Sequence, residues 1–233
     1  MTNETNGESL LVAMQFADSF LPAGSFTTSY ALEAFVEATD VEDAADLREL
    51  LETYVHRQIG PCEMIAVSVA HDAAETDDID RLANVDERLT AVQLPAEFRR
   101  SSTKTGSQLL SLVAETDPHE VLSAYDRRVA GGEAPGNYAV VIGIVGACSG
   151  ISARETAIAH AYAFLRDMLG AAQRLLRLGH TAVQQVLTDL RPAIIDAWEA
   201  NHERSATEMT PFAPLIDVAS MEHERADRRL FMS

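Results

Sequence analysis

The sequence is poor in cysteine and lysine, and each shortage excludes a class of site. Cys62 and Cys148 are the two cysteines, and neither belongs to a Cys-x-x-Cys pair. We therefore expect neither a disulfide framework nor a zinc ribbon. Lys104 is the only lysine among 18 basic residues, and no glycine pair with P-loop spacing precedes it. A P-loop needs that lysine to reach the nucleotide phosphates, so we expect no such nucleotide site in this chain.

Long apolar segments are also missing. The longest apolar run, residues 138–151, contains three glycines and is too short to span a bilayer. Residues 1–8 are polar and lack the pattern of a signal peptide. We expect a soluble, cytoplasmic protein whose residues 1–8 are disordered.

Positive charge is scarce, and the formal net charge is −18. Phosphate backbones and anionic lipid surfaces bind clustered cations, so nucleic acid and membranes are not expected partners. An acidic surface with almost no lysine favours a salt-rich cytoplasm, where screening reduces the repulsion between carboxylates. Compositional drift is the alternative explanation.

Familiar catalytic patterns are absent or incomplete. No His-Glu-x-x-His motif is present, and the seven histidines are scattered. Gly24-Ser25-Phe26 lacks the second glycine of a nucleophile elbow. Two alternatives remain open: a helical hydrolase that uses Asp18, Ser19 and a distant histidine, or a metallochaperone that binds nickel through histidine and cysteine.

Helical periodicity dominates what is present. Leu47, Leu50, Leu51, Tyr54 and Val55 recur at three- and four-residue steps, which indicates one apolar helix face. Ser152 and Glu155 form a capping-box pattern at the start of another helix, and Gly179 fits the end of that helix. Pro192 should kink or divide a helix over 181–200.

Further helices are predicted at about 9–17, 27–38, 46–59, 61–73, 79–91, 95–115, 118–130 and 138–149. The pattern predicts an all-α, single-domain bundle of roughly ten helices over residues 9–233.

Three segments differ from ordinary amphipathic helix. Residues 16–33 place Asp, Ser, Pro, Gly and aromatic residues between two apolar stretches, and a loop so rich in aromatics must pack against the core or a partner. Residues 97–110 carry a rare basic cluster of Arg99, Arg100 and Lys104, which suits an acidic partner, an anion or intrachain pairing. Residues 214–233 end in Arg228-Arg229-Leu230-Phe231-Met232, a composition typical of interface anchors.

Together these segments resemble the UreF family of urease accessory proteins. The first family pattern, Ala-Asp-Ser-x-x-Pro-x-Gly-[Gly/Ser]-Phe-x-x-Ser-x-x-Leu-Glu, is matched by Ala17, Asp18, Ser19, Pro22, Gly24, Ser25, Phe26, Ser29, Leu32 and Glu33. A middle pattern is matched by Glu97, Arg99, Ser102, Gly106 and Leu109, and a later one by Val140, Val141, Gly143, Leu178, Gly179 and Thr181. The tail pattern is matched by Asp217–Met221, His223, Glu224 and Arg229–Phe231. The sequence departs from the family at His180, Glu222, Asp227 and Met232.

The resemblance implies a non-catalytic, commonly dimeric all-α protein without a cofactor of its own. It implies a complex with UreD (also called UreH), the GTPase UreG and the urease apoprotein, in which nickel is loaded into urease. A docking tail would begin at about residue 212. The motif positions carried over as partner-binding are Asp18, Ser19, Pro22, Gly24, Phe26, Ser29, Tyr30, Glu33, Arg99, Arg100, Gly106, Ser220, Met221, His223, Arg229, Leu230 and Phe231.

Overall fold

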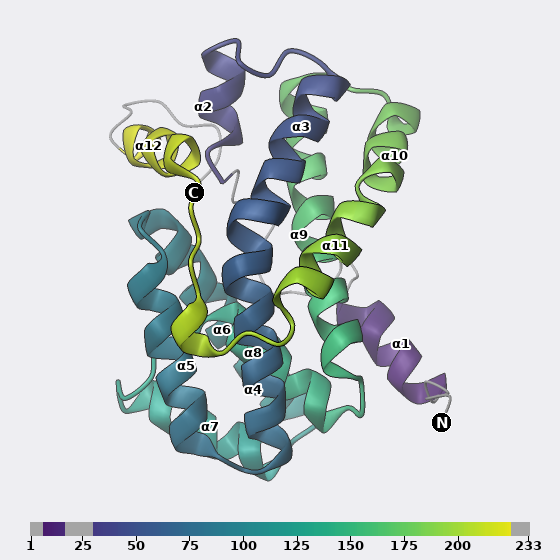
Figure 1. The fold of residues 1–233 in the computed structure, drawn as a ribbon. Helices are drawn as coiled ribbons and strands as arrows, with labels where there is room; N and C mark the ends of the chain where they lie inside the picture. The colour runs from purple at the N-terminus through teal and green to yellow at the C-terminus, as the bar shows by residue number, and fades with distance from the viewer. Residues whose placement is uncertain (1–6, 17–29, 225–233) are drawn as a thin grey trace.

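The computed structural model describes residues 7–16 and 30–224, and within them it contains helices and no strand (Figure 1). The all-α prediction is confirmed. The elements are α1 (Gly7–Phe16), α2 (Leu32–Glu37), α3 (Ala44–Tyr54), the π-helix η2 (Val55–Met64), α4 (Ile65–Glu75), α5 (Ile79–Val92), α6 (Ala96–Thr116), α7 (Glu120–Ala130), α8 (Tyr138–Cys148), α9 (Ala153–Leu175), α10 (His180–Asp189), α11 (Arg191–Asn201), the 3-10 turn η3 (Ala206–Glu208) and α12 (Pro214–His223).

Helix α8 forms the centre of the core, packed against α4, α6 and α9. It is apolar on every side, and residues 139–146 are all buried, as expected for a helix without a solvent face. Two glycines allow its close contacts. A Cβ atom at Gly143 would lie 2.6 Å from the Val67 carbonyl oxygen, and one at Gly146 would lie 2.3 Å from Thr156 Oγ1. The predicted helix at 138–149 is therefore confirmed.

The expected boundary between helices at residue 60 is wrong, because α3, η2 and α4 follow one another without a break. Pro61 lies inside η2. Proline has no N–H to donate to the carbonyl four residues earlier, and a π-helical segment absorbs this defect. That carbonyl belongs to Arg57, and it accepts instead from the Phe212 N–H at 2.9 Å. The Pro61 carbonyl accepts from the Thr210 N–H at 3.1 Å. The π-helix thus anchors the segment that leads into α12.

A buried carboxylate fixes the loop between α7 and α8. Asp86 of α5 is fully buried and accepts from the Tyr125 hydroxyl (2.6 Å) and the Gly136 N–H (2.6 Å). It also accepts from both the backbone N–H (3.0 Å) and the side-chain amide (2.6 Å) of Asn137. Burial raises the pKa of Asp86, and the hydrogen bonds oppose that shift. The network holds the loop against α6 at Gly106.

The remaining helix ends follow the sequence with one exception. The Ser152–Glu155 capping box at the start of α9 is present, and Pro192 lies in the first turn of α11, where it separates that helix from α10. Gly179, however, does not end α9. That helix stops at Leu175, Arg177 takes a positive φ of 52°, and Gly179 precedes α10. No described helix is long and apolar enough to cross a membrane.

Candidate partner-docking site

Three of the motif segments meet at one buried junction. Glu33 comes from α2, Glu97 from α6 and His223 from α12. His223 Nε2 lies 3.2 Å from Glu33 Oε2, and His223 Nδ1 lies 3.5 Å from Glu97 Oε2. All three side chains are only 3% exposed. His223 is therefore joined to two segments more than a hundred residues earlier in sequence by acidic side chains that solvent hardly reaches.

The helix ends match these charges. Glu33 and Glu97 lie in the first turns of α2 and α6, and His223 lies in the last turn of α12. Backbone dipoles favour negative charge at a helix N-terminus and positive charge at a C-terminus. Glu224 adds a direct cap, because its Oε1 accepts from the Glu97 N–H at 2.8 Å. We call the set Glu33, Glu97, His223 and Glu224 the helix junction.

The other end of α12 is attached to the π-helix. Asp217 Oδ1 accepts from the Gln58 side-chain amide at 3.2 Å, and burial raises the pKa of Asp217. The two backbone bonds from Thr210 and Phe212 lie just before the helix. Helix α12 is therefore fixed at both ends, beside α2 (Figure 1).

Tyr30 packs against aromatic side chains of α6 and α9 rather than lying at a free surface. Its half-buried ring packs edge-on against Phe98 at a centroid distance of 5.2 Å and against Phe164 at 5.0 Å. The Tyr30 carbonyl accepts a hydrogen bond from the Tyr54 hydroxyl. Burial, followed by the nearby charge of Glu63, raises the pKa of the Tyr30 phenol. Tyr30 therefore positions the start of α2.

The arginines of α6 differ in their contacts. Arg99 is half-buried, and its Nη1 donates to the carbonyls of Gln93 and Leu94, both at 2.6 Å, so it closes the turn before α6. Arg100 and Lys104 are exposed one helical turn apart and form a small basic surface. Gly106 is buried, and a Cβ atom there would lie 2.0 Å from the Gly136 carbonyl oxygen, so the residue allows close packing against that loop.

Helix α12 separates its motif residues into two faces. Ser220 is fully buried and His223 nearly so. The outward face is apolar and open to solvent: Phe212, Leu215, Val218 and Met221 are 72%, 77%, 50% and 37% exposed. Leu215, Val218 and Met221 recur every three positions of α12 and so share one side of the helix, and Phe212 lies just before its first turn. We call these four residues the α12 strip. An exposed apolar stripe of this kind is typical of an interaction surface.

Much of the predicted site lies outside the described residues. Those positions are Asp18, Ser19, Pro22, Gly24, Phe26, Ser29, Arg229, Leu230 and Phe231. The same holds for residues 1–6 of the segment predicted to be disordered, while Gly7 and Glu8 belong to α1.

The sequence predicted a docking tail from about residue 212, but sequence reasoning missed helix α12 and did not single out most of its exposed strip. Phe212, Leu215 and Val218 were not among the predicted contact residues, although their three-residue spacing and Pro214 in the first turn were signals for a helix.

Burial also raises the pKa of the Cys62 thiol well above its ordinary value. A buried, protonated thiol is a poor metal ligand, which disfavours a nickel site at Cys62.

The fold and the helix junction define an all-helical protein whose motif residues secure one helix on a compact body. A family model described as UreF matches residues 41–191, more than half of the chain. The urease accessory protein UreF of Yersinia pestis (strain Pestoides F) is 31% identical over 226 residues, which cover 97% of this chain and 99% of the relative. UreF proteins of Yersinia pseudotuberculosis serotype IB (strain PB1/+) and Yersinia enterocolitica serotype O:8 / biotype 1B are each 30% identical over 226 residues, with the same coverage. The chain belongs to the UreF family of urease accessory proteins.

Proposed function

We propose that this protein is a non-catalytic scaffold that binds UreD (UreH) and the GTPase UreG and assists nickel insertion into the urease apoprotein, acting as a homodimer within that complex. Membership of the UreF family supports the assignment to urease maturation. The observation that carries the docking proposal is the α12 strip, an exposed apolar face on a helix fixed at both ends.

A helix held in place suits the docking role. Ordering a flexible segment costs binding free energy, whereas a preformed surface avoids that cost. The helix junction and the π-helix contacts hold α12 before any partner arrives. We expect Phe212 and Leu215 to act as anchors, because they are the most exposed members of the strip and large apolar side chains gain most from burial. UreD is the partner that we assign to this face, and Arg229–Phe231, which lie outside the described residues, remain predicted contacts with it.

The proposed contribution to GTP hydrolysis is positional. An arginine inserted into a GTPase site can raise its rate by about 10³–10⁵, so an arginine finger is the rival role. Arg99 is held by two carbonyls of its own chain, which makes it a poor finger. Arg100 is exposed and therefore remains a candidate finger among the motif arginines. Arg229 is the other candidate to test, and it lies outside the described residues.

The test is reconstitution with UreD, UreG and urease apoprotein from the same source. Co-purification of this chain with UreD and UreG, together with urease activation that depends on it, would support the scaffold. Arg100→Ala and Arg229→Ala should leave single-turnover GTP hydrolysis in the assembled complex within a few-fold of the unmodified rate. A loss of about a hundredfold with assembly intact would overturn the positional role. Failure of the chain to associate with either partner would overturn the scaffold itself.

A further inference from the structure

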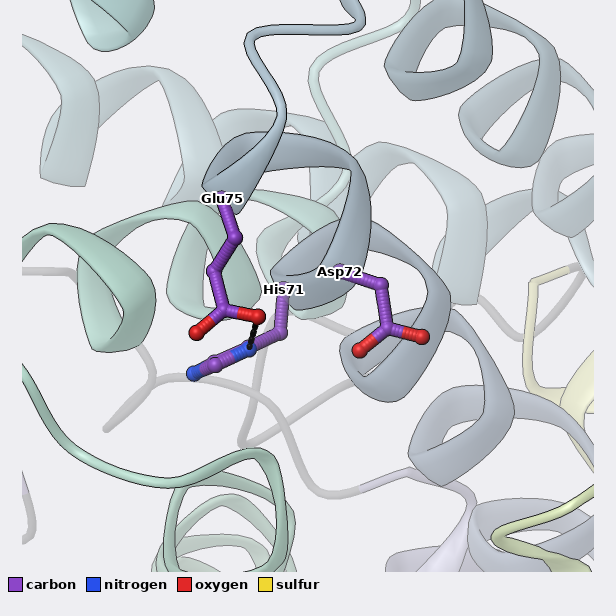
Figure 2. A group of neighbouring side chains, drawn as sticks. All are labelled: His71, Asp72 and Glu75. Carbon is purple, nitrogen blue, oxygen red and sulfur yellow. Dashed lines mark ion pairs between the residues drawn. The ribbon is translucent and has the colours of Figure 1, made fainter.

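A histidine and two carboxylates gather near the end of α4, at the opposite end of the molecule from α12 (Figure 1). They are His71, Asp72 and Glu75, and one ligand atom from each lies within 4.8 Å of the others. Figure 2 shows the His71 ring below the Glu75 carboxylate, with Asp72 projecting from the adjacent position of the same helix. His71 is 4% exposed, whereas the Asp72 and Glu75 side chains are 55% and 61% exposed. The cluster therefore joins a fixed, buried imidazole to two carboxylates that solvent reaches.

The surroundings of the ring decide which nitrogen is available. His71 Nε2 lies 2.7 Å from the Ile151 carbonyl oxygen. A carbonyl can only accept, so Nε2 carries the hydrogen. Nδ1 is buried and makes no hydrogen bond within the described residues. It faces Glu75 Oε2 at 3.9 Å, which is too long for a hydrogen bond. When neutral, the imidazole thus points its lone pair toward a carboxylate, an arrangement that a cation between them would stabilise.

We propose that His71 Nδ1, Glu75 and Asp72 bind one divalent transition cation of the zinc type. The bond from Nε2 to a backbone carbonyl is the partner that metal-binding histidines usually have, since it fixes both tautomer and ring orientation. Two ligand atoms about 2.1 Å from one tetrahedral ion lie about 3.4 Å apart. Closing the 3.9 Å gap therefore needs a shift of about half an ångström, which the exposed Glu75 side chain can supply.

The charge at this end of α4 also favours a cation. The site occupies the last turns of the helix, where the backbone dipole is negative and no basic residue is present. Arg81 approaches Asp72 at 3.9 Å and is the neighbouring cation that a metal would displace. The Arg81 side chain is 46% exposed, so it can move into solvent. One imidazole and two carboxylates suit zinc-type ions better than magnesium, which prefers oxygen ligands alone.

The test is calorimetric titration of untagged, chelator-treated protein with ZnCl₂ and, separately, MgCl₂. We expect saturable binding of one zinc per chain and no comparable binding of magnesium. Glu75→Gln and Asp72→Asn should each weaken zinc binding by about tenfold or more. Both positions are exposed, so neither variant should disturb the fold. Glu49→Gln is the matched control, because Glu49 and His56 line another surface hollow while both are exposed. It should bind zinc as the unmodified protein does.

The nitrogen resonances of His71 give a second, independent measurement. On addition of zinc, the Nδ1 resonance should change to that of a metal-bound nitrogen while Nε2 keeps its hydrogen. The proposal is overturned if zinc and magnesium bind alike, which would indicate an acidic surface only. It is also overturned if Glu75→Gln keeps full zinc affinity, or if both nitrogens of His71 carry hydrogens at saturating zinc. None of these outcomes depends on docking through α12.

Discussion

At the scale of single residues, His223 is the side chain of the helix junction that approaches both Glu33 and Glu97. It faces Glu33 at 3.2 Å and Glu97 at 3.5 Å in a region that solvent hardly reaches. Removing one member of a buried polar cluster takes from its neighbours a contact that solvent cannot replace, which typically costs several kcal/mol. The junction is therefore sensitive to changes that would be mild at a surface.

We predict that His223→Gln lowers the free energy of unfolding by about 3 kcal/mol. The substitution keeps a polar side chain of similar reach but removes the ring whose two nitrogens face Glu33 and Glu97 at the same time. Urea denaturation followed by circular dichroism measures the change. Glu222→Gln, at the exposed neighbouring position, is the control and should change stability by less than about 0.5 kcal/mol. Equal stability of the two variants would show that the junction contributes little.

At the scale of elements, close helix contacts explain motif residues that carry no chemistry. Gly106 of α6 belongs to the middle sequence motif, and its backbone lies against the loop that Asp86 holds. The absence of a side chain at Gly106 thus lets α6 pack closely against the loop between α7 and α8. This packing role is separate from any contact that Gly106 makes with a partner.

Gly106→Ala should destabilise the protein by about 2 kcal/mol or more, because the added methyl would overlap the Gly136 carbonyl oxygen at 2.0 Å. Gly170→Ala is the matched control. Gly170 also lies within a helix, but a Cβ atom there would meet nothing within 4 Å. Alanine favours the helix by about 0.5–1 kcal/mol, so this variant should be slightly more stable. Thermal unfolding of both variants checks the pair, and similar losses in both would contradict the packing explanation.

The sequence could predict the elements that depend on local signals, but not those that depend on contacts between distant residues. The capping box of α9 and the division at Pro192 are local signals, and both are confirmed. The π-helix could not be foreseen, because the carbonyl that Pro61 leaves unpaired is satisfied by Phe212, 151 positions later than Pro61 in the printed sequence. The junction was equally hidden. Glu33 and His223 were singled out by their motifs, but nothing local indicates that they meet each other and Glu97.

At the scale of the whole molecule, the net charge of −18 is the dominant feature. Surface carboxylates repel one another in the folded state. At 0.1 M salt this repulsion is largely screened between charges more than about 10 Å apart. We predict that the melting temperature rises as KCl is increased from low to molar concentration. Sucrose at matched osmolality is the control, because it stabilises by exclusion from the protein surface without screening charge. A melting temperature independent of KCl would contradict the explanation by charge repulsion.

The central claim is that α12 presents a preformed docking face for UreD. The most direct measurement is the affinity of UreD for the intact chain carrying Phe212→Ser and Leu215→Ser, which replace the two expected anchors of the α12 strip. Leu11→Ser with Met14→Ser on α1 is the matched control, since these side chains are comparably exposed. We predict that the α12 pair weakens UreD binding by about a hundredfold, as loss of interface anchors does, with an unchanged circular dichroism spectrum and a control that binds normally. Undiminished UreD binding by the α12 variant would contradict the account.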